Sequence, residues 1–252
     1  MTLATMFADV VPYLRYHNAL GTGRPQSLTP LLPEGLVGNL TGGFPFFGGA
    51  IVLILGVLTL GSDYGWGTLK TLFTQRPGRL HVFAAKLLAL AIALVPFVLL
   101  VFVIGGVASY LVAQRENAAV DWPSLSLVIR GFAASWFLLA VWAALGVLLA
   151  VVTRGTALAI GIGILWALVV EGLVSALFDE TSLLRPLIKL FLRANGYSLV
   201  QGLGGALDAS DNGPGSFSGP FVDGAQAALV LGAYLIGFVA LSASILRRRD
   251  VA

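Results

Sequence analysis

The chain contains the stretch Asp63-Tyr-Gly-Trp-Gly-Thr-Leu-Lys-Thr-Leu-Phe-Thr-Gln-Arg-Pro-Gly-Arg79, a short polar and basic segment between two long apolar runs. The run before it covers residues 44–61, and the run after it covers residues 82–113, with Lys86 as its only charge. A helix needs about 20 apolar residues to cross a bilayer. A polar segment held between two such runs predicts two membrane-crossing helices joined by a short loop.

The composition of the whole chain indicates a membrane protein. Hydrophobic residues make up 58% of the chain and charged residues 11%, whereas soluble domains carry roughly 25% charged residues. The absence of cysteine excludes disulfides, thiol catalysis and thiolate metal sites. The net charge of +3 is too small to indicate a nucleic-acid partner.

The apolar runs predict an all-α fold, a polytopic transmembrane helix bundle of five spans. The spans are helical because every backbone amide in lipid must be hydrogen-bonded within its own segment. We expect them at residues 44–61, 82–112, 129–152, 156–178 and 225–246. The second run exceeds one crossing, which predicts a tilt or a break near Pro96. Glycines inside the runs predict close helix packing: Gly105, Gly106, Gly161, Gly163, Gly232 and Gly237.

Basic residues gather on one side of the predicted bundle. Loop 62–81 with Lys86, the turn at 153–155 and the C-terminal tail together carry eight basic and two acidic residues. The other side carries nine acidic and seven basic residues. Because basic loops stay in the cytoplasm, we expect the basic side and the C-terminus to be cytoplasmic, in the plasma membrane. Residues 1–43 are then an extracytoplasmic N-terminal segment. We expect either a first helix missing upstream, which we prefer, or a short tail that crosses unaided.

The loop at 62–81 contains a helical pattern of its own. Thr68 can cap a short helix that the turn pair Pro77-Gly78 ends. Leu69, Leu72 and Phe73 fall on one face of this helix. Such a helix can lie on the membrane surface or insert its apolar face into a groove of a partner protein.

The long external loop at 179–223 also has a helical part. Apolar residues repeat at helical spacing between residues 183 and 192, while Arg185, Lys189 and Arg193 recur every fourth residue. This pattern predicts an interfacial or re-entrant helix at the outer leaflet. Residues 202–224 are rich in Gly, Ser, Asp and Pro, which is typical of a flexible loop.

Glu171 is the one acidic residue well inside a predicted span. Ionisable groups within the bilayer face other helices or water, because lipid solvates them poorly. Two interpretations remain open. Glu171 either lines a translocation path, or it is a hydrogen-bonded contact between helices or a carboxyl that reaches outward.

Recognisable catalytic motifs are missing from the sequence. The two histidines, His17 and His81, fall on opposite predicted sides of the membrane, and no His, Asp and Glu cluster has metal-ligand spacing. No phosphate-binding Gly-rich loop is present either. We therefore expect no enzyme activity and no cofactor in this chain, and any work must draw on a gradient or a partner.

The motif from Asp63 to Lys86 resembles the signature of type-2 ATP-binding-cassette permeases. In that signature an acidic residue is followed by Gly-Thr-Leu and a basic residue. A Leu, a Thr, an Arg and a Lys come after them at fixed spacings, and this chain has the same order and spacing. The matching residues are Asp63, Gly67, Thr68, Leu69, Lys70, Leu72, Thr74, Arg79 and Lys86. The tail Arg247, Arg248, Arg249 and Asp250 is similar to the Arg-Arg-Asp ending of the same family.

This resemblance implies a coupling helix between the first two spans found here. The helix would dock in a groove of a cytoplasmic ATPase subunit, which binds ATP and Mg²⁺. The implied coupling residues are Asp63, Trp66, Gly67, Thr68, Leu69, Lys70, Leu72, Phe73, Arg76 and Arg79. A second permease chain, either a copy or a paralogue, would complete the transporter. External helices such as the one expected at 181–193 also occur in that family.

The chain departs from the family pattern in two places. Asp63 stands where glutamate is usual, which shortens the side chain by one methylene. Six spans are the norm, and the elbow helix and the first span of that family have no counterpart here.

The resulting expectation is a transmembrane permease subunit, an exporter that takes its energy from a separate ATPase. Two alternatives remain: a gradient-driven carrier or channel that uses Glu171, or a membrane scaffold that transports nothing. The residues do not indicate a substrate.

Overall fold

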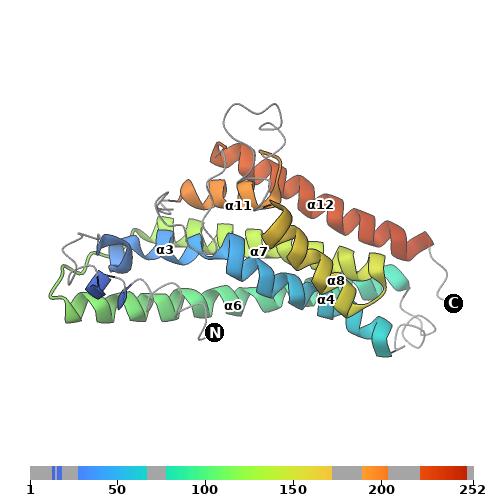
Figure 1. The fold of residues 1–252 in the computed structure, drawn as a ribbon, viewed down its shortest axis with the longest axis horizontal. Coiled ribbons are helices and arrows are strands. Elements are labelled where there is room, and N and C mark those ends of the chain that lie inside the picture. Colours follow the sequence, from blue (N-terminus) through green and yellow to red (C-terminus); the bar gives the residue numbers. More distant parts are fainter. Residues whose placement is uncertain are drawn as a thin grey trace.

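A computed structural model of the chain describes residues 13–14, 16–18, 28–66, 78–171, 189–203 and 222–248. Every regular element in these ranges is a helix, as predicted for the fold class (Figure 1). The α-helices are α3 (Leu36–Gly42), α4 (Gly49–Trp66), α6 (Arg79–Arg115), α7 (Leu125–Thr153), α8 (Thr156–Ile164), α11 (Leu192–Gln201) and α12 (Gly224–Arg248). Two π-helical segments are η4 (Phe44–Gly48) and η5 (Leu165–Val170), and two 3₁₀ turns are η2 (Thr29–Leu31) and η3 (Pro33–Gly35).

Three of these helices, α6, α7 and α12, are long and apolar enough to cross a membrane. They contain the predicted second, third and fifth spans, and they indicate a membrane protein. Helix α4 is apolar but shorter, over residues 49–64. Helix α8 continues through η5 to Glu171, beyond which residues 172–188 lie outside the described part of the chain. The number of five spans therefore stays a prediction.

A further helical segment precedes the helix that contains the first predicted span. Helix α3 lies within the segment assigned to the N-terminal region, and it buries Leu36, Val37 and Leu40. The π-helical segment η4 connects it to α4, with Gly48 N–H donating to the Gly43 carbonyl five residues back. Pro45 has no amide hydrogen for an α-helical bond, and a π turn in this place continues the helix around it.

Helix α6 runs through Pro96 without a break, one of the two outcomes that the sequence predicted there, and the tilt stays a prediction. It has 37 residues, so it is about 55 Å long, well beyond the roughly 30 Å of a bilayer core. Trp136 of α7 donates from Nε1 to the Ala91 carbonyl, 2.9 Å away and about one turn before the proline. This bond ties α6 to α7 where proline weakens the helix.

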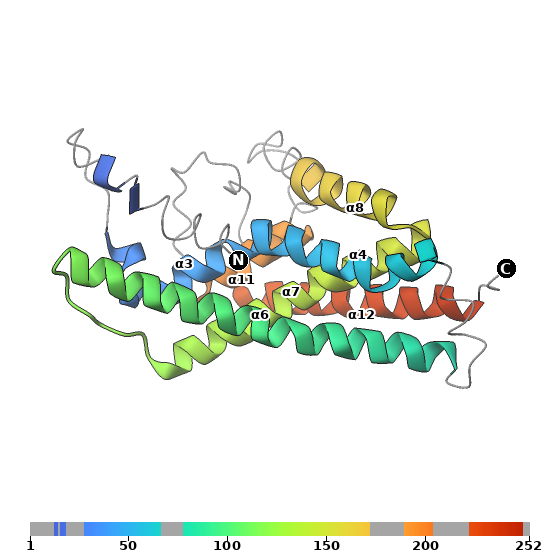
Figure 2. The same ribbon diagram turned by 90° about the horizontal axis from the view of Figure 1, so that it is seen from below.

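Helix α7 lies in the middle of the bundle, with α6 and α12 on its flanks (Figures 1 and 2). In its most apolar stretch 61% of the residues are buried, against 22% for α6 and 17% for α12. Large apolar side chains are therefore exposed along α6 and α12, among them Leu88 and Leu229. Such surfaces suit lipid or another membrane protein rather than water.

Helices α4 and α7 approach most closely at two glycines. A Cβ on Gly56 would overlap the carbonyl of Ala143, and one on Gly146 would overlap the carbonyl of Leu53. Because small residues let helix backbones meet, these two positions determine how near α4 comes to α7. The sequence did not single out either of them.

The glycines that the sequence did single out divide into two groups. A Cβ on Gly105 would collide with Leu40, and one on Gly163 with Leu53, as expected for close packing. Gly106 and Gly232 have only loose neighbours, and Gly161 and Gly237 have no atom within 4 Å of that position. Within the described ranges, none of these four glycines is at a close helix contact.

Candidate functional site

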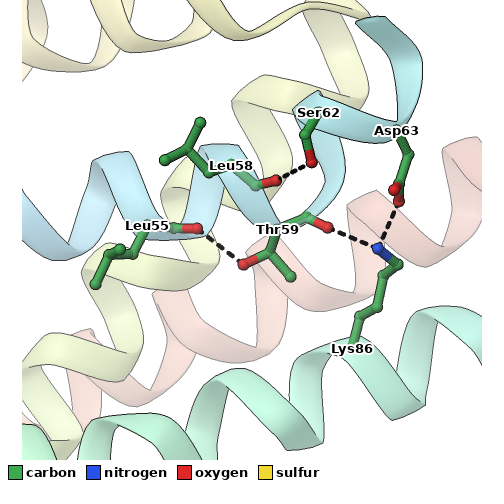
Figure 3. A network of polar contacts seen from close by, with 6 residues as sticks. All are labelled: Leu55, Leu58, Thr59, Ser62, Asp63 and Lys86. Atoms are coloured by element: carbon green, nitrogen blue, oxygen red, sulfur yellow. Dashed lines mark hydrogen bonds and ion pairs between the residues drawn. The ribbon is translucent and has the colours of Figure 1, made fainter. Parts of the chain in front are cut away.

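Asp63 and Lys86 form an ion pair that joins the end of α4 to the start of α6 (Figure 3). The Lys86 Nζ lies 2.5 Å from the Asp63 Oδ2. It also donates to the carbonyl of Thr59, one turn earlier in α4, at 2.9 Å. We call these three residues the clasp.

The clasp is partly shielded from water. The side chain of Asp63 is 12% exposed and that of Lys86 is 26% exposed. Coulomb attraction strengthens as water is excluded, so this pair holds the two helices more firmly than a pair on an open surface.

The last turns of α4 satisfy their hydroxyl groups locally. Thr59 donates to the Leu55 carbonyl at 2.8 Å, and Ser62 donates to the Leu58 carbonyl at 2.6 Å (Figure 3). These bonds within the helix leave the Lys86 ammonium to bridge Asp63 and the Thr59 carbonyl. The hydroxyl groups of Thr59 and Ser62 therefore need no hydrogen-bond partner on another helix.

The clasp brings together the first and last residues of the motif from Asp63 to Lys86. Trp66 is the final residue of α4, and Arg79 is the first residue of α6. The other predicted coupling residues lie outside the described residues: Gly67, Thr68, Leu69, Lys70, Leu72, Phe73 and Arg76. The short helix expected there stays a prediction.

The three basic segments lie at one end of the bundle. The ends of α4 and α12, the start of α6 and the turn between α7 and α8 all lie there (Figures 1 and 2). Arg154 ends α7 in the left-handed conformation, with φ 57°. Arg247 and Arg248 form the last turn of α12. Arg249 and Asp250 lie outside the described residues.

Glu171 follows η5, at the end of the described helical stretch that begins with α8. Its carboxylate forms a hydrogen bond with the first turn of α11. One carboxylate oxygen accepts from the backbone N–H of Arg193 at 2.7 Å, and the other accepts from Trp166 Nε1 at 3.1 Å. The residue is 2% exposed. A carboxylate is favourable at a helix N-terminus because the first amides have no partner within the helix. Of the two interpretations, the hydrogen-bonded contact between helices is present, and a role in translocation stays a prediction.

A family model described as "Protein of unknown function (DUF2705)" matches residues 10–252. The chain belongs to this family. Neither the comparison with curated proteins nor the comparison with solved structures gave a match.

The DUF2705 chain differs from the sequence-based expectation around Arg193. The pattern placed Lys189 and Arg193 on one face of an interfacial helix, but α11 starts only at Leu192, and Lys189 is in the turn before it. Arg193 is 4% exposed, and its guanidinium lies 5.5 Å from the ring of Tyr197. The reason is Glu171, which receives the first amides of α11 and fixes where this helix begins.

Helix α11 itself was missed by the sequence analysis. Residues 192–198 are all buried, including the polar Arg193, Asn195 and Ser198. Asn195 donates to the carbonyls of Lys189 and Phe191, both at 2.8 Å. Buried polar groups of this kind are tolerated when they are hydrogen-bonded, but the apolar periodicity that signals a helix is then absent. The one sequence feature that could have indicated α11 was Glu171, an acidic residue within a predicted span.

Among the described residues of this DUF2705 chain, no group of three His, Asp or Glu side chains could hold a metal ion.

Proposed function

We propose that this chain is the transmembrane permease subunit of an ATP-driven transporter, acting as an exporter. A separate cytoplasmic ATPase supplies the energy by pushing on the segment from Trp66 to Phe73. A second permease chain, a copy or a paralogue, completes the translocation path.

The clasp is the observation that carries this proposal. Force applied to a flexible loop moves only the loop, whereas helices joined at its base move together. Asp63 and Lys86 join α4 to α6 on the two sides of the proposed docking segment. A push on that segment would reach both helices, and through Gly56 and Gly146 it would reach α7.

The basic end of the bundle supports the proposed orientation. Helix ends that carry Lys86, Arg154, Arg247 and Arg248 share one end of the molecule (Figure 2). The positive-inside rule assigns such an end to the cytoplasm, where an ATPase has access to ATP. On this basis the protein belongs in the plasma membrane, with its C-terminus in the cytoplasm.

Copurification with a candidate ATP-binding-cassette ATPase, sought first in the reading frames beside its gene, tests the proposal. The wild-type chain should copurify with this ATPase and change its rate of ATP hydrolysis in proteoliposomes. Leu72→Asp places a charge in the apolar face of the docking segment and should abolish both effects. Lys70→Glu should weaken them. Leu125→Asp is the matched control, since Leu125 is 74% exposed at the opposite end of the bundle.

Full copurification and unchanged hydrolysis with Leu72→Asp would contradict the proposal. Loss of copurification and of the changed hydrolysis rate with Leu125→Asp would show that a Leu-to-Asp change is damaging wherever it is made. That result would also count against docking at Leu72.

A gradient-driven carrier is a second candidate, favoured by the buried carboxylate of Glu171. It predicts ion-coupled flux in proteoliposomes that contain this chain and no ATPase. Glu171→Gln should then abolish the flux, whereas an ATP-driven permease needs the ATPase for any vectorial transport.

A further inference from the structure

A cavity of about 240 Å³ lies between α7, η5, the start of α11 and the middle of α12. Four aromatic residues line it, together with two leucines and one carboxylate. The lining residues are Leu145, Trp166, Glu171, Phe191, Leu192, Tyr234 and Phe238. This cavity is not needed for the permease proposal, which rests on the clasp at the basic end of the bundle.

The lining residues include one acidic side chain and no lysine or arginine. Glu171 is the only ionisable acid or base among the lining residues apart from the phenol of Tyr234. The faces of aromatic rings are also negative, because their quadrupoles place electron density above and below the ring plane. Arg193, whose backbone amide donates to Glu171, is not one of the lining residues, and its guanidinium lies over the Tyr197 ring.

Glu171 and two of the aromatic residues are held in place. Trp166 donates to Glu171, and Tyr234 donates from its hydroxyl to the Leu190 carbonyl at 2.8 Å. The rings of Tyr234 and Phe238 lie 5.4 Å apart. Glu171 lines the cavity while it accepts the bonds from Arg193 and Trp166, so a ligand can contact the carboxylate with these bonds in place.

The lining selects for a ligand that is apolar apart from one positive charge. An anion would meet the carboxylate of Glu171. A sugar or another strongly polar ligand would find few hydrogen-bonding groups, since burial of unpaired polar atoms is costly. Aromatic rings with a nearby carboxylate attract alkylammonium groups through cation–π and ionic contacts.

We propose that this cavity binds a lipophilic organic cation, an amine or quaternary ammonium ion with an apolar group. The charge lies against Glu171, and the apolar part packs between Trp166, Tyr234 and Phe238. Because Trp166 is 49% exposed on the apolar surface of the bundle, the ligand enters from the side of the protein that faces lipid.

The test uses the purified full chain in lipid nanodiscs, with no ATPase present. The probe is radiolabelled phenyltrimethylammonium, and tert-butylbenzene is its neutral isostere. The wild-type chain should bind the cation saturably above empty nanodiscs. Unlabelled cation should displace it, and tert-butylbenzene should not. Non-saturable uptake, or equal displacement by the isostere, would overturn the proposal.

Two variants locate the site. Glu171→Gln keeps an acceptor for the Arg193 amide but removes the charge, so the Kd should rise roughly ten- to hundredfold. Trp166→Leu removes one ring and should raise the Kd roughly fivefold. Glu34→Gln changes an exposed glutamate elsewhere and should leave the Kd unchanged.

Unchanged cation binding in a folded Glu171→Gln or Trp166→Leu protein would place the ligand elsewhere and overturn the assignment. Thermal unfolding of each variant establishes that it is folded. Failure of this proposal leaves the permease proposal intact, since binding is measured without the ATPase.

Discussion

The pairing of Asp63 with Lys86 depends on the lengths of the two side chains, which extend toward each other from two helices. Lysine has a long flexible side chain with three donors, so it can satisfy a carboxylate and a backbone carbonyl together. Aspartate is shorter than the glutamate usual at this position of the resembling family. Here the short side chain still meets Lys86, because the lysine side chain extends from α6 to the end of α4 (Figure 3).

Removal of either partner of the clasp should destabilise the chain. Lys86→Met and Asp63→Asn should each lower the free energy of unfolding by about 1–3 kcal/mol, because a shielded charge loses its partner. A double-mutant cycle in detergent should give a coupling energy of similar size. Asp121→Asn, a change at an exposed acid, is the control, and strict additivity of the two clasp changes would refute the interaction.

Glu171 should be more sensitive to loss of its acceptor oxygens than to loss of its charge. Glu171→Ala leaves the buried Arg193 amide unpaired, at a cost of about 1–3 kcal/mol, and removes the acceptor of the half-exposed Trp166 indole. Glu171→Gln keeps one carbonyl oxygen and should unfold closer to the wild-type temperature. Equal losses in the two variants, measured by thermal unfolding in detergent, would contradict the role of Glu171 at the start of α11.

At the scale of elements, the contact between α4 and α7 depends on the absence of two side chains. Both glycines face a backbone carbonyl of the other helix rather than a side chain that could move away. A backbone cannot shift locally without moving its helix, so these positions accept no larger residue at the present distance.

Gly56→Ala should therefore lower the free energy of unfolding by about 1–3 kcal/mol, the cost typical of overpacking. Gly161→Ala is the matched control, because it makes the same change in α8 with no atom within 4 Å. The control should be neutral or slightly stabilising, since alanine is the better helix former by up to about 1 kcal/mol. Equal effects of the two changes on unfolding in detergent would contradict the close approach.

At the scale of the whole molecule, the predicted orientation follows from the charges at the two ends of the bundle. The natural chain has no cysteine, so single cysteines can report the side on which a residue lies. Arg248→Cys should react with an impermeant maleimide only after the cells are opened. Ala119→Cys, in the connection between α6 and α7, should react in intact cells.

Reaction of Arg248→Cys in intact cells would reverse the orientation and remove the basis for docking a cytoplasmic ATPase. The cysteine-free chain is the control for background labelling.

The sequence by itself determined the helical class, the membrane setting and the approximate bounds of α6, α7 and α12. These follow from local quantities, namely the length of each apolar run and the positions of charged and turn residues. The Asp63 and Lys86 motif was also visible as a spacing, but its pairing was not.

Only the tertiary structure decided which residues meet. The clasp, the Gly56 and Gly146 contacts, and the capping of α11 by Glu171 each join segments that are distant in sequence. A residue pattern records the propensity and polarity of each segment, whereas a contact depends on the backbone positions of two segments at once. The start of α11 at Leu192 is the clearest case, because it is fixed by a carboxylate that lies outside the helix.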